Sequence, residues 1–153
     1  MGEDQLTSRP AGEIQNSIQL VAEEGASLSS GSLRLYAIKA TDLRITPKAE
    51  DYIGAVDLYA YDPLNRRCAV GIMVATDHRR QGYALAMLHA LQSLYTSRGV
   101  HGPLHILYAD IAASNTASLA LFSKAGYTEC GHFKEWLYVN GQYIDSIRMQ
   151  LLL

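Results

Sequence analysis

The 153-residue chain is poor in the residues that mark several specialised classes of protein. It contains only two cysteines, Cys68 and Cys130, which form no C-x-x-C pair and have no histidine pattern nearby. A disulfide-stabilised secreted fold and a cysteine-based metal site therefore find no support, and we expect two reduced, packed thiols. Twelve glycines and four prolines also give no sign of a fibrous or disordered composition.

Two further features are lacking, an excess of charge and a long apolar run. The formal net charge is -2, so the sequence predicts no general nucleic-acid surface and no surface for anionic membranes. No apolar run approaches the roughly 20 residues that span a bilayer, and residues 1–7 lack the basic and apolar regions of a signal peptide. We therefore expect a cytoplasmic protein.

What the chain has is the size and apolar content of one domain. Hydrophobic residues make up 48% of it, enough for a substantial core within a single domain over 1–153. Apolar spacing and turn signals predict a helix over 11–24, a strand over 33–38, a loop over 41–51, strands over 52–61 and 67–74, a helix ending near 99, a strand over 104–111, a helix ending at 124, and strands over 133–139 and 142–151. This order, with Asn140-Gly141 as a hairpin turn, predicts an α/β domain with a mixed sheet.

The turn before the second predicted helix combines the features of an anion site. His78, Arg79, Arg80 and Gln81 supply donors there, and Gly82 lets a bulky anion approach the backbone closely. Unpaired N–H groups and the positive end of the helix dipole meet at the same point. An ordinary strand-to-helix turn with exposed arginines would have the same composition, so the turn alone leaves both interpretations open.

Three segments, in order along the chain, carry a resemblance to a known family. Arg79 to Ala84 fits the pattern Q/R-x-x-G-x-G/A, and Asn115 to Tyr127 fits N-x-x-S/A-x-x-L-Y/F-x-K-x-G-F/Y. Together they resemble the GNAT acyltransferases, and Gly131 to Met149 resembles the terminal hairpin of the spermidine/diamine and ribosomal-protein N-terminal acetyltransferases. The resemblance covers about 52–153. It implies a mixed central sheet flanked by helices and transfer of an acetyl group from acetyl-CoA to a primary amine.

The resemblance also assigns cofactor-binding residues. The strand before the turn would hold the pantetheine arm through its backbone, and the turn would bind the pyrophosphate. Asn115 and Ser118 would contact pantetheine or pyrophosphate, although helix capping also accounts for them, and Lys124 is either near the nucleotide or a solvated cation at a helix end. The predicted set, which includes no metal ligand, is Ile72, Met73, Val74, Arg79, Arg80, Gln81, Gly82, Tyr83, Ala84, Asn115, Ser118 and Lys124.

Amine acetylation needs a group that takes a proton, because an alkylamine with a pKa of about 10.4 is mostly protonated at neutral pH. Asp57 interrupts an apolar strand at a place where polyamine-acetylating relatives carry a glutamate, so the resemblance makes it the first candidate. Asp110 is the second candidate and Glu135 the third. For each of them, a strand-end carboxylate or a salt bridge to an arginine is the structural alternative.

The resemblance implies two more groups. A backbone N–H near Met73 or Val74 would stabilise negative charge on the thioester carbonyl. The thiolate of coenzyme A must also leave, and many relatives protonate it with a tyrosine where this chain has Phe122. Tyr127 and Tyr108 are the candidates to replace that acid; alternatively the thiolate leaves unassisted, since the pKa of a thiol is about 8.5.

The front of the chain departs from the family. Only one helix is predicted before the strand over 33–38, so we expect the usual first strand and first helix to be missing from 1–32. A truncated or divergent gene product, or an edge covered by another subunit of a homo-oligomer, would account for this. The acceptor therefore stays open among a small amine, a polyamine and a protein N-terminus. A GNAT-fold module that binds acyl-CoA without turnover and an interaction domain without a cofactor are the alternative functions.

Overall fold

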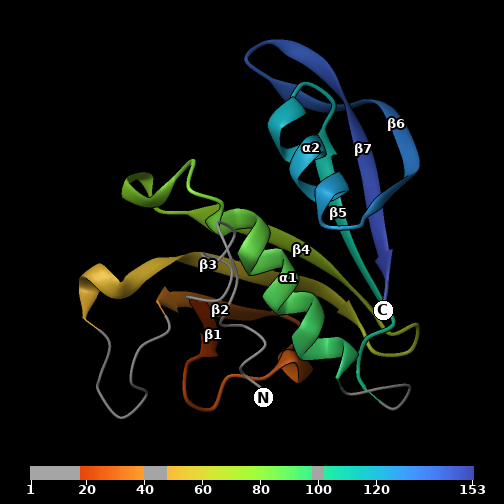
Figure 1. The fold of residues 1–153 in the computed structure, drawn as a ribbon. Helices are drawn as coiled ribbons and strands as arrows, with labels where there is room; N and C mark the ends of the chain where they lie inside the picture. Colours follow the sequence, from red (N-terminus) through yellow and green to blue (C-terminus); the bar gives the residue numbers. More distant parts are fainter. Residues whose placement is uncertain (1–17, 40–47, 98–101) are drawn as a thin grey trace.

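The computed structural model describes residues 18–39, 48–97 and 102–153, which form one seven-stranded sheet and two α-helices (Figure 1). The strands are β1 (Ile18–Ala22), β2 (Leu33–Lys39), β3 (Tyr52–Asp62), β4 (Arg67–Val74), β5 (Ile106–Ala112), β6 (Thr128–Val139) and β7 (Gln142–Leu152). The helices are α1 (Tyr83–Thr96) and α2 (Thr116–Lys124), and short 3-10 turns cover Leu28–Ser30, Ala49–Asp51 and Thr76–His78.

The sheet has the order β1-β2-β3-β4-β5-β7-β6, and β4 with β5 is the parallel pair among the described strands. Their pairing joins Arg67–Ala69 to Ile106–Tyr108 and then stops, although β4 continues to Val74 and β5 to Ala112. The two strands diverge beyond this point (Figure 1). We call the opening between them the strand gap. It divides the sheet into a half with β1 to β4 and a half with β5 to β7.

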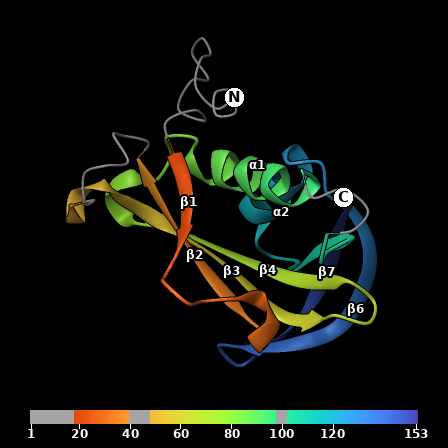
Figure 2. The ribbon, with the colours of Figure 1, turned by 90° about the horizontal axis from the view of Figure 1, so that it is seen from below.

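Both α-helices lie on the same face of the sheet (Figure 2). The apolar residues of α1 recur every three or four positions, so the helix buries one side against the sheet. Met87, Leu88 and Leu91 from α1 belong to the same core as Leu58 from β3 and Leu107 from β5. The opposite face of the sheet, which we call the open face, carries no α-helix among the described residues. Neither of these helices is long and apolar enough to cross a membrane.

Most of the predicted elements are confirmed. The strands predicted over 33–38, 52–61 and 67–74 are β2, β3 and β4, with ends that agree to within one residue. The last two strands form the predicted hairpin, in which Asn140 and Gly141 both have positive φ, 50° and 77°. A type I′ turn requires these angles, and such a two-residue turn sets the register of the strands beside it. These elements follow from local sequence alone.

The helix predicted over 11–24 is wrong where the structure describes it. Residues 18–22 form β1, which pairs antiparallel with β2, whereas residues 11–17 lie outside the described part of the chain. Pairing with β2 and burial of Ile18 in the core outweighed the helical spacing of this short segment. The sheet therefore has a strand before β2, which we expected to be missing, and only a 3-10 turn lies between the two strands.

Two predicted segments fall partly outside the described residues. Of the loop predicted over 41–51, residues 41–47 are not described, and Ala49–Asp51 form a 3-10 turn. The helix α1 is described to its end at Thr96. The helix end that we expected at residues 98–99 lies outside the described residues.

We expect Gly54→Ala to destabilise the fold, because the new Cβ would overlap the backbone oxygen of Met73, which cannot rotate away. Overpacking of this kind costs up to about 3 kcal/mol, and for a chain of this size that lowers the melting temperature by roughly 6–12 °C. Thermal unfolding followed by circular dichroism measures the shift. Gly71→Ala is the matched control, since its Cβ would meet Tyr59 at 3.7 Å, an ordinary contact. Equal shifts in the two variants would contradict the prediction.

Candidate functional site

The turn between β4 and α1 arranges backbone N–H groups around one point. Arg80 and Gly82 both have positive φ, 62° and 83°, with Gln81 between them. Left-handed residues in such a turn direct successive N–H groups into a shared concavity. Gly82 is also the N-cap residue of α1 and has no side chain that could cap it, so the first N–H groups of the helix are left for a ligand or water. The backbone of this turn therefore has a geometry that suits an anion.

Side chains of the turn brace its shape. Arg79 Nε donates to the carbonyl oxygen of Val74 at 3.0 Å, and Gln81 Nε2 donates at 3.2 Å to a carbonyl of the preceding 3-10 turn. The rings of His78 and Tyr83 meet edge to face, with their centroids 5.7 Å apart. Arg79 and Gln81, which the resemblance assigned to the pyrophosphate, thus fix the turn to the end of β4 and to the 3-10 turn.

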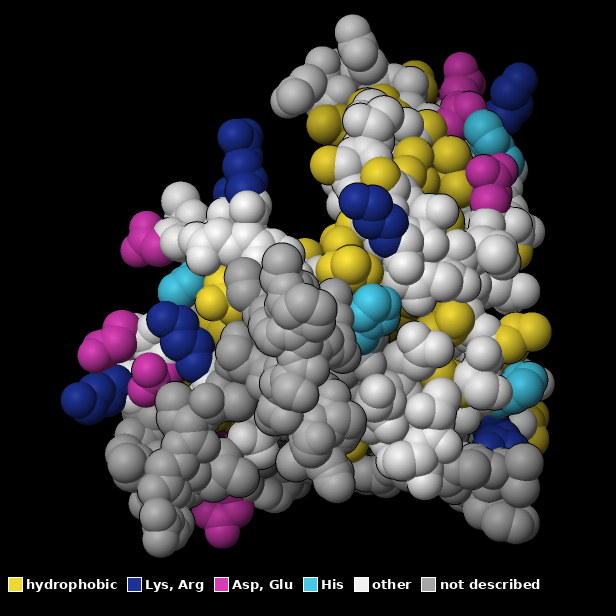
Figure 3. All heavy atoms as spheres, viewed as in Figure 1, with side chains coloured by type: hydrophobic (Ala, Val, Ile, Leu, Met, Phe, Trp, Pro, Cys, Tyr) yellow, Lys and Arg dark blue, Asp and Glu magenta, His cyan; other side chains and the backbone are white. Residues whose placement is uncertain are grey.

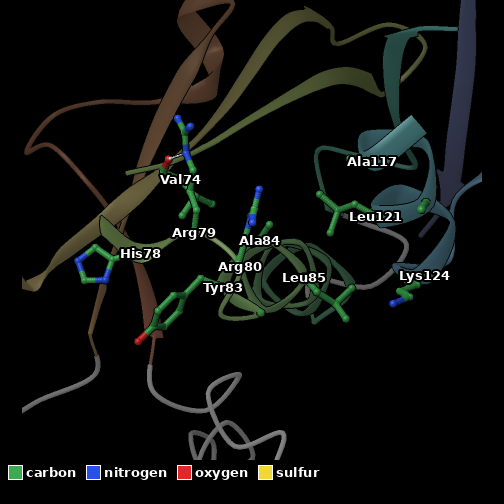
Figure 4. Close-up of a pocket in the computed structure, with 12 residues that line it drawn as sticks. Val74, His78, Arg79, Arg80, Tyr83, Ala84, Leu85, Ala117, Leu121 and Lys124 are labelled. Atoms are coloured by element: carbon green, nitrogen blue, oxygen red, sulfur yellow. Dashed lines mark hydrogen bonds between the residues drawn. The ribbon is translucent and has the colours of Figure 1, made fainter. Parts of the chain in front are cut away.

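A pocket of about 440 Å³ opens beside the turn, and we call it the turn pocket. Figure 4 places Arg80 on the turn and Lys124 on α2, at opposite sides of this pocket. The space-filling view shows a hollow between the two halves of the molecule, with basic side chains on both sides of it (Figure 3). The lining consists of Val74, His78, Arg79, Arg80, Gly82, Tyr83, Ala84, Leu85, Ala117, Ala120, Leu121 and Lys124.

The lining contains most of the residues that we predicted on the turn, together with three residues of α2 that we did not predict. Ala117, Ala120 and Leu121 face the pocket from α2. Their spacing with Lys124 marks one side of a helix, so a signal for them was present in the sequence. The predicted cofactor residues that do not line the pocket are Ile72, Met73, Gln81, Asn115 and Ser118.

Asn115 caps α2. Its Oδ1 accepts from the backbone N–H of Ser118 at 3.1 Å, which satisfies one of the unpaired donors at the start of the helix. The structure therefore shows the capping alternative for Asn115, and Ser118 takes part through its backbone. Direct contact of either side chain with a ligand stays a prediction.

The end of β4 presents backbone groups to the strand gap. The Ala75 N–H donates to the carbonyl oxygen of Ile53 on β3 at 2.7 Å. Because hydrogen-bonded and non-hydrogen-bonded positions alternate along an antiparallel pair, the amide groups of Met73 also face β3, whereas those of Ile72 and Val74 face the strand gap. There β4 is no longer paired with β5. A chain-like ligand in the gap can therefore reach the backbone of Ile72 and Val74.

Asp57, the first candidate for the base, forms a two-point ion pair with Arg34. Nε and Nη2 of Arg34 donate to the two carboxylate oxygens at 2.6 and 2.8 Å, from the opposite position on β2. Hydrogen bonding to this guanidinium lowers the pKa of Asp57 from its usual value, although burial opposes the change. The Asp57 side chain keeps 42% of its surface exposed. We did not predict Arg34, because the connection between β2 and β3 is too long for its sequence to set their register.

Asp110, the second candidate, forms a similar pair with Arg148. Arg148 Nε and Nη2 donate to its two carboxylate oxygens at 2.7 and 3.0 Å, from the opposite position on β7. The same guanidinium lies over the ring of Tyr108, 4.5 Å from its centroid. Glu135, the third candidate, lies in a bulge of β6, which β5 and β7 separate from the strand gap. The two aspartates are therefore close to the gap, each in an ion pair, and Glu135 is remote from it.

Asp57 and Asp110 flank the strand gap on the open face. Asp57 lies opposite Gly71 on β4, just beyond the last residue of β4 that pairs with β5. The alternation of side chains along each strand places Asp110 on the same face of β5. Burial raises the pKa of Tyr59 on β3, and the negative charge of Asp110 adds to this rise, so Asp110 lies near β3 side chains. The two carboxylates thus approach the gap from its two sides.

Phe122 and Tyr127 pack against each other in the core. Their rings meet edge to face with centroids 4.9 Å apart, and their exposed fractions are 3% and 2%. The Tyr127 hydroxyl is buried and has no hydrogen-bond partner within the described part of the chain, and burial raises its pKa. Neither residue lines the turn pocket. A role of Tyr127 as the acid for a leaving thiolate stays a prediction, and this position does not favour it.

The described residues offer no cluster of metal ligands: no group of three or more His, Cys, Asp or Glu side chains among them could hold a metal ion. Both cysteines are free thiols. The expected packing is confirmed for Cys68, which is buried, and is wrong for Cys130, which is exposed. Burial raises the pKa of Cys68 to about 11, so this thiol is protonated and unreactive at neutral pH.

Comparison with known proteins identifies relatives of this chain. The family model of the acetyltransferase (GNAT) domain matches residues 11–128. The chain is 30% identical over 104 residues to spermidine N(1)-acetyltransferase from Vibrio cholerae, a match that covers 67% of this chain and 58% of that protein. It is 28% identical over 99 residues to the putative ribosomal N-acetyltransferase YdaF from Bacillus subtilis, covering 65% and 52%. The chain thus spans somewhat more than half the length of these two curated relatives.

Solved structures of spermidine N-acetyltransferase from Vibrio cholerae have a similar fold. One of them, in complex with CoA and spermine, matches with a TM-score of 0.66 at 26% identity, over 81% of this chain and 67% of that chain. A dodecameric structure of the same enzyme in an intermediate state matches with a TM-score of 0.64 at 26% identity, over 80% and 65%. The fold that the sequence motifs led us to expect is therefore confirmed.

Proposed function

The chain belongs to the GNAT acetyltransferase family, and from this premise we propose that it transfers an acetyl group from acetyl-CoA to a primary amine. The observation that carries the proposal is the continuity of the turn pocket with the end of β4 at the strand gap. A backbone anion site, an apolar cavity and an unpaired strand edge follow one another here. Pyrophosphate, pantetheine arm and thioester follow one another in the same way along acetyl-CoA.

The turn is the part of the chain that we assign to the pyrophosphate. In this proposal the backbone N–H groups of Arg80–Ala84 bind it, and Arg80 and Lys124 add positive charge from the two sides of the turn pocket. Arg79 acts indirectly, because it ties the turn to Val74. The residues present fit a bulky anion, since apart from Gly82 and its chain neighbours no described residue lies within 4 Å of the place where a Cβ of Gly82 would be.

The end of β4 is the part that we assign to the pantetheine arm and the thioester. Acetyl-CoA, when bound, supplies an activated acetyl group. The backbone of Ile72 would hydrogen-bond the arm, and the Val74 N–H would donate to the thioester carbonyl oxygen, where it stabilises the negative charge that develops during transfer. Met73, the other residue predicted for this task, directs its N–H toward β3, so we assign the donor to Val74.

Asp57 is the group to which we assign the proton of the attacking amine. Its position opposite Gly71, on the open face at the border of the strand gap, supports this assignment. The lowered pKa keeps the carboxylate ionised at neutral pH, so it attracts an ammonium and accepts a proton directly or through one water. Asp110, on the other side of the gap, is the second candidate.

Among the described residues, none of the candidates that we considered is well placed to protonate the leaving thiolate. Phe122 has no proton to donate, the Tyr127 hydroxyl is buried outside the lining of the turn pocket, and Tyr108 packs under the guanidinium of Arg148. We infer that the thiolate leaves as an anion, which a thiol pKa of about 8.5 makes possible.

The acceptor is a small amine, a polyamine or a protein N-terminus. The relatives support amine acetylation, since one is named for spermidine and another is named as a ribosomal N-acetyltransferase. Their acceptors are proposals for this chain, because it spans only part of their length. A homo-oligomer, supported by the dodecameric relative, and a cytoplasmic location are proposed on the same footing.

Calorimetric titration with acetyl-CoA, followed by a thiol-release assay, tests the proposed function. The assay covers polyamines, amino acids, aminoglycosides and peptide N-termini. We expect saturable binding and amine-dependent thiol release. Binding of acetyl-CoA with no thiol release for any of the acceptors would favour the alternative of an acyl-CoA-binding module without turnover. A lack of saturable binding at millimolar acetyl-CoA would favour the remaining alternative, an interaction domain without a cofactor.

A further inference from the structure

A second pocket, of about 520 Å³, lies on the open face of the sheet, and we call it the open-face pocket. Val74 lines the turn pocket, whereas its neighbours Met73 and Ala75 line the open-face pocket, because successive side chains of β4 point to opposite faces. Tyr36 and Tyr52 add aromatic surface to its wall. With acetyl-CoA in the turn pocket, as we propose, the open-face pocket is the side from which an amine reaches the strand gap.

The charged members of the pocket lining are Glu23 and Arg34, and they belong to a row of charges across three strands. Arg34 on β2 lies opposite Asp57 on β3 and forms the two-point ion pair with it. On the other side of β2, Ala22 of β1 is the partner of Leu35. The same register, continued by one residue, places Glu23 opposite Arg34. One guanidinium therefore lies between two carboxylates on the open face.

Glu23 is the member of this row that has no partner of its own. It is exposed, and it forms no ion pair within the described part of the chain. Residues at opposite positions of an antiparallel pair have Cβ atoms about 4.5–5.5 Å apart, so an arginine and a glutamate there can meet by side-chain rotation alone. Glu23 therefore offers Arg34 a second carboxylate without any movement of the backbone.

The ion pair between Arg34 and Asp57 is one that an amine can disturb. The two side chains keep 48% and 42% of their surface exposed, and exposed ion pairs contribute little because water competes for both partners. A protonated amine that reaches Asp57 adds a second cation to this carboxylate and repels the guanidinium. Hydrogen bonding to Arg34 also lowers the pKa of Asp57, so the carboxylate becomes a stronger proton acceptor once Arg34 has left it.

We propose that Glu23 is a positioning residue for the acceptor amine and that it acts through Arg34. When the ammonium reaches Asp57, the guanidinium moves to Glu23, and Asp57 holds the ammonium and then takes its proton. From Glu23 to the ammonium the row then alternates in sign, so no two like charges are neighbours. The inference rests on the proposed amine acetylation. It explains how a carboxylate that an arginine already neutralises can still receive an amine.

The exchange of Arg34 is tested without any ligand, since Asp57→Asn removes the charge that an ammonium would neutralise. The NMR signal of the Arg34 Nε–H, identified by its absence in Arg34→Gln, reports the partner of the guanidinium. We expect Glu23→Gln to leave this signal unchanged in the wild-type background and to shift it in the Asp57→Asn background. Glu24→Gln is the matched control, because Glu24 is also exposed but lies outside the pocket lining. An Arg34 signal that ignores Glu23 in Asp57→Asn, or that responds equally to Glu24, would overturn the inference.

The kinetics of the best acceptor found by the thiol-release assay test whether the exchange serves the amine. Glu23→Gln should lower kcat/KM for the amine by roughly twofold to fivefold, the range of an exposed ion pair. The KM for acetyl-CoA should stay unchanged, because Glu23 does not line the turn pocket. In the Arg34→Gln background the same change should have no further effect, since Glu23 acts through that guanidinium.

The outcomes of the two experiments separate the exchange from the proposed function. An equal loss from Glu23→Gln with and without Arg34 would show that Glu23 binds the amine directly, and a wild-type kcat/KM in Glu23→Gln would remove its role, so either result overturns the inference. A lack of thiol release for every acceptor, with an Arg34 signal that still responds to Glu23 in Asp57→Asn, would refute acetyl transfer and leave the exchange standing.

Discussion

Asp57→Asn is expected to lower kcat for acetyl transfer by about 100-fold or more, in the range that general acid–base groups contribute. The carboxylate lies opposite Gly71 at the border of the strand gap, and an amide in its place can neither accept a proton nor hold an ammonium. The KM for acetyl-CoA should stay unchanged, because Asp57 does not line the turn pocket. Steady-state thiol release at varied acetyl-CoA and amine concentrations measures both constants.

The pH profile of the same variant gives a second readout. Arg34 lowers the pKa of Asp57 from 3.8, so the carboxylate is ionised throughout the neutral range and adds no acid limb there. We expect kcat/KM to rise with pH toward the pKa of the free amine, about 10.4 for an alkylamine, and Asp57→Asn to lower this curve without moving it.

The ion pair also makes folding stability depend on pH, because the pKa of Asp57 is lower in the folded protein than in the unfolded chain. The stability that the pair contributes is present above the pKa of the unfolded chain, and it is lost as the pH falls through the pKa of the folded protein.

Asp62→Asn is the matched control for Asp57→Asn. Asp62 lies at the other end of β3, pairs with Arg67 at 3.3 Å, and lines neither the turn pocket nor the open-face pocket. An equal loss of rate in both variants would assign the effect to the lost ion pair. A wild-type rate in Asp57→Asn would transfer the role of base to Asp110.

Gly82→Asp is expected to weaken acetyl-CoA binding by about 100-fold or more. Gly82 has a φ of 83°, and a residue with a Cβ pays about 1–2 kcal/mol in this left-handed region. We expect the free turn of the variant to relax away from this conformation, so that binding must restore it at the same cost, which corresponds to roughly 5-fold to 30-fold in affinity. The carboxylate adds repulsion at a site that we assign to the pyrophosphate. Isothermal titration calorimetry with acetyl-CoA measures the dissociation constant.

Two further glycine variants separate the causes. Gly82→Ala keeps the site free of charge, and its Cβ meets no atom within 4 Å, so a loss of roughly tenfold would come from backbone conformation alone. Gly141→Asp is the control for the strain, because Gly141 also has positive φ, 77°, and open space but lies in the distant β6–β7 turn. Equal affinity of wild type and Gly82→Asp for acetyl-CoA would show that the turn is not the pyrophosphate site.

The cofactor side of the candidate site could be predicted because its parts are local. The end of β4, the turn and the start of α1 are contiguous, and Gly82 has the positive φ that suits the anion site proposed from the motif. The second motif placed Lys124 in the turn pocket because one helix carries both ends of the pattern. Only the side of α2 that carries Ala117 and Leu121 was overlooked.

The acceptor side could not be predicted in this way. Arg34, Tyr52 and Met73 come from three different strands, and which of their side chains meet depends on strand register. The same limitation explains the error at residues 18–22, where a short apolar segment fits a helix or a strand and the neighbouring strand β2 decides between them.

By itself the sequence determined the family, the mixed sheet and the strand-turn-helix unit that we propose as the anion site, since short-range spacing and turn chemistry encode them. Only the tertiary structure decided that Arg34 neutralises Asp57, that Asn115 caps its helix, and that two pockets approach the end of β4 from opposite faces. The physical reason is that strand pairing over long connections sets which charges meet. The sequence specifies the charge of a side chain, but the fold determines which partner neutralises it.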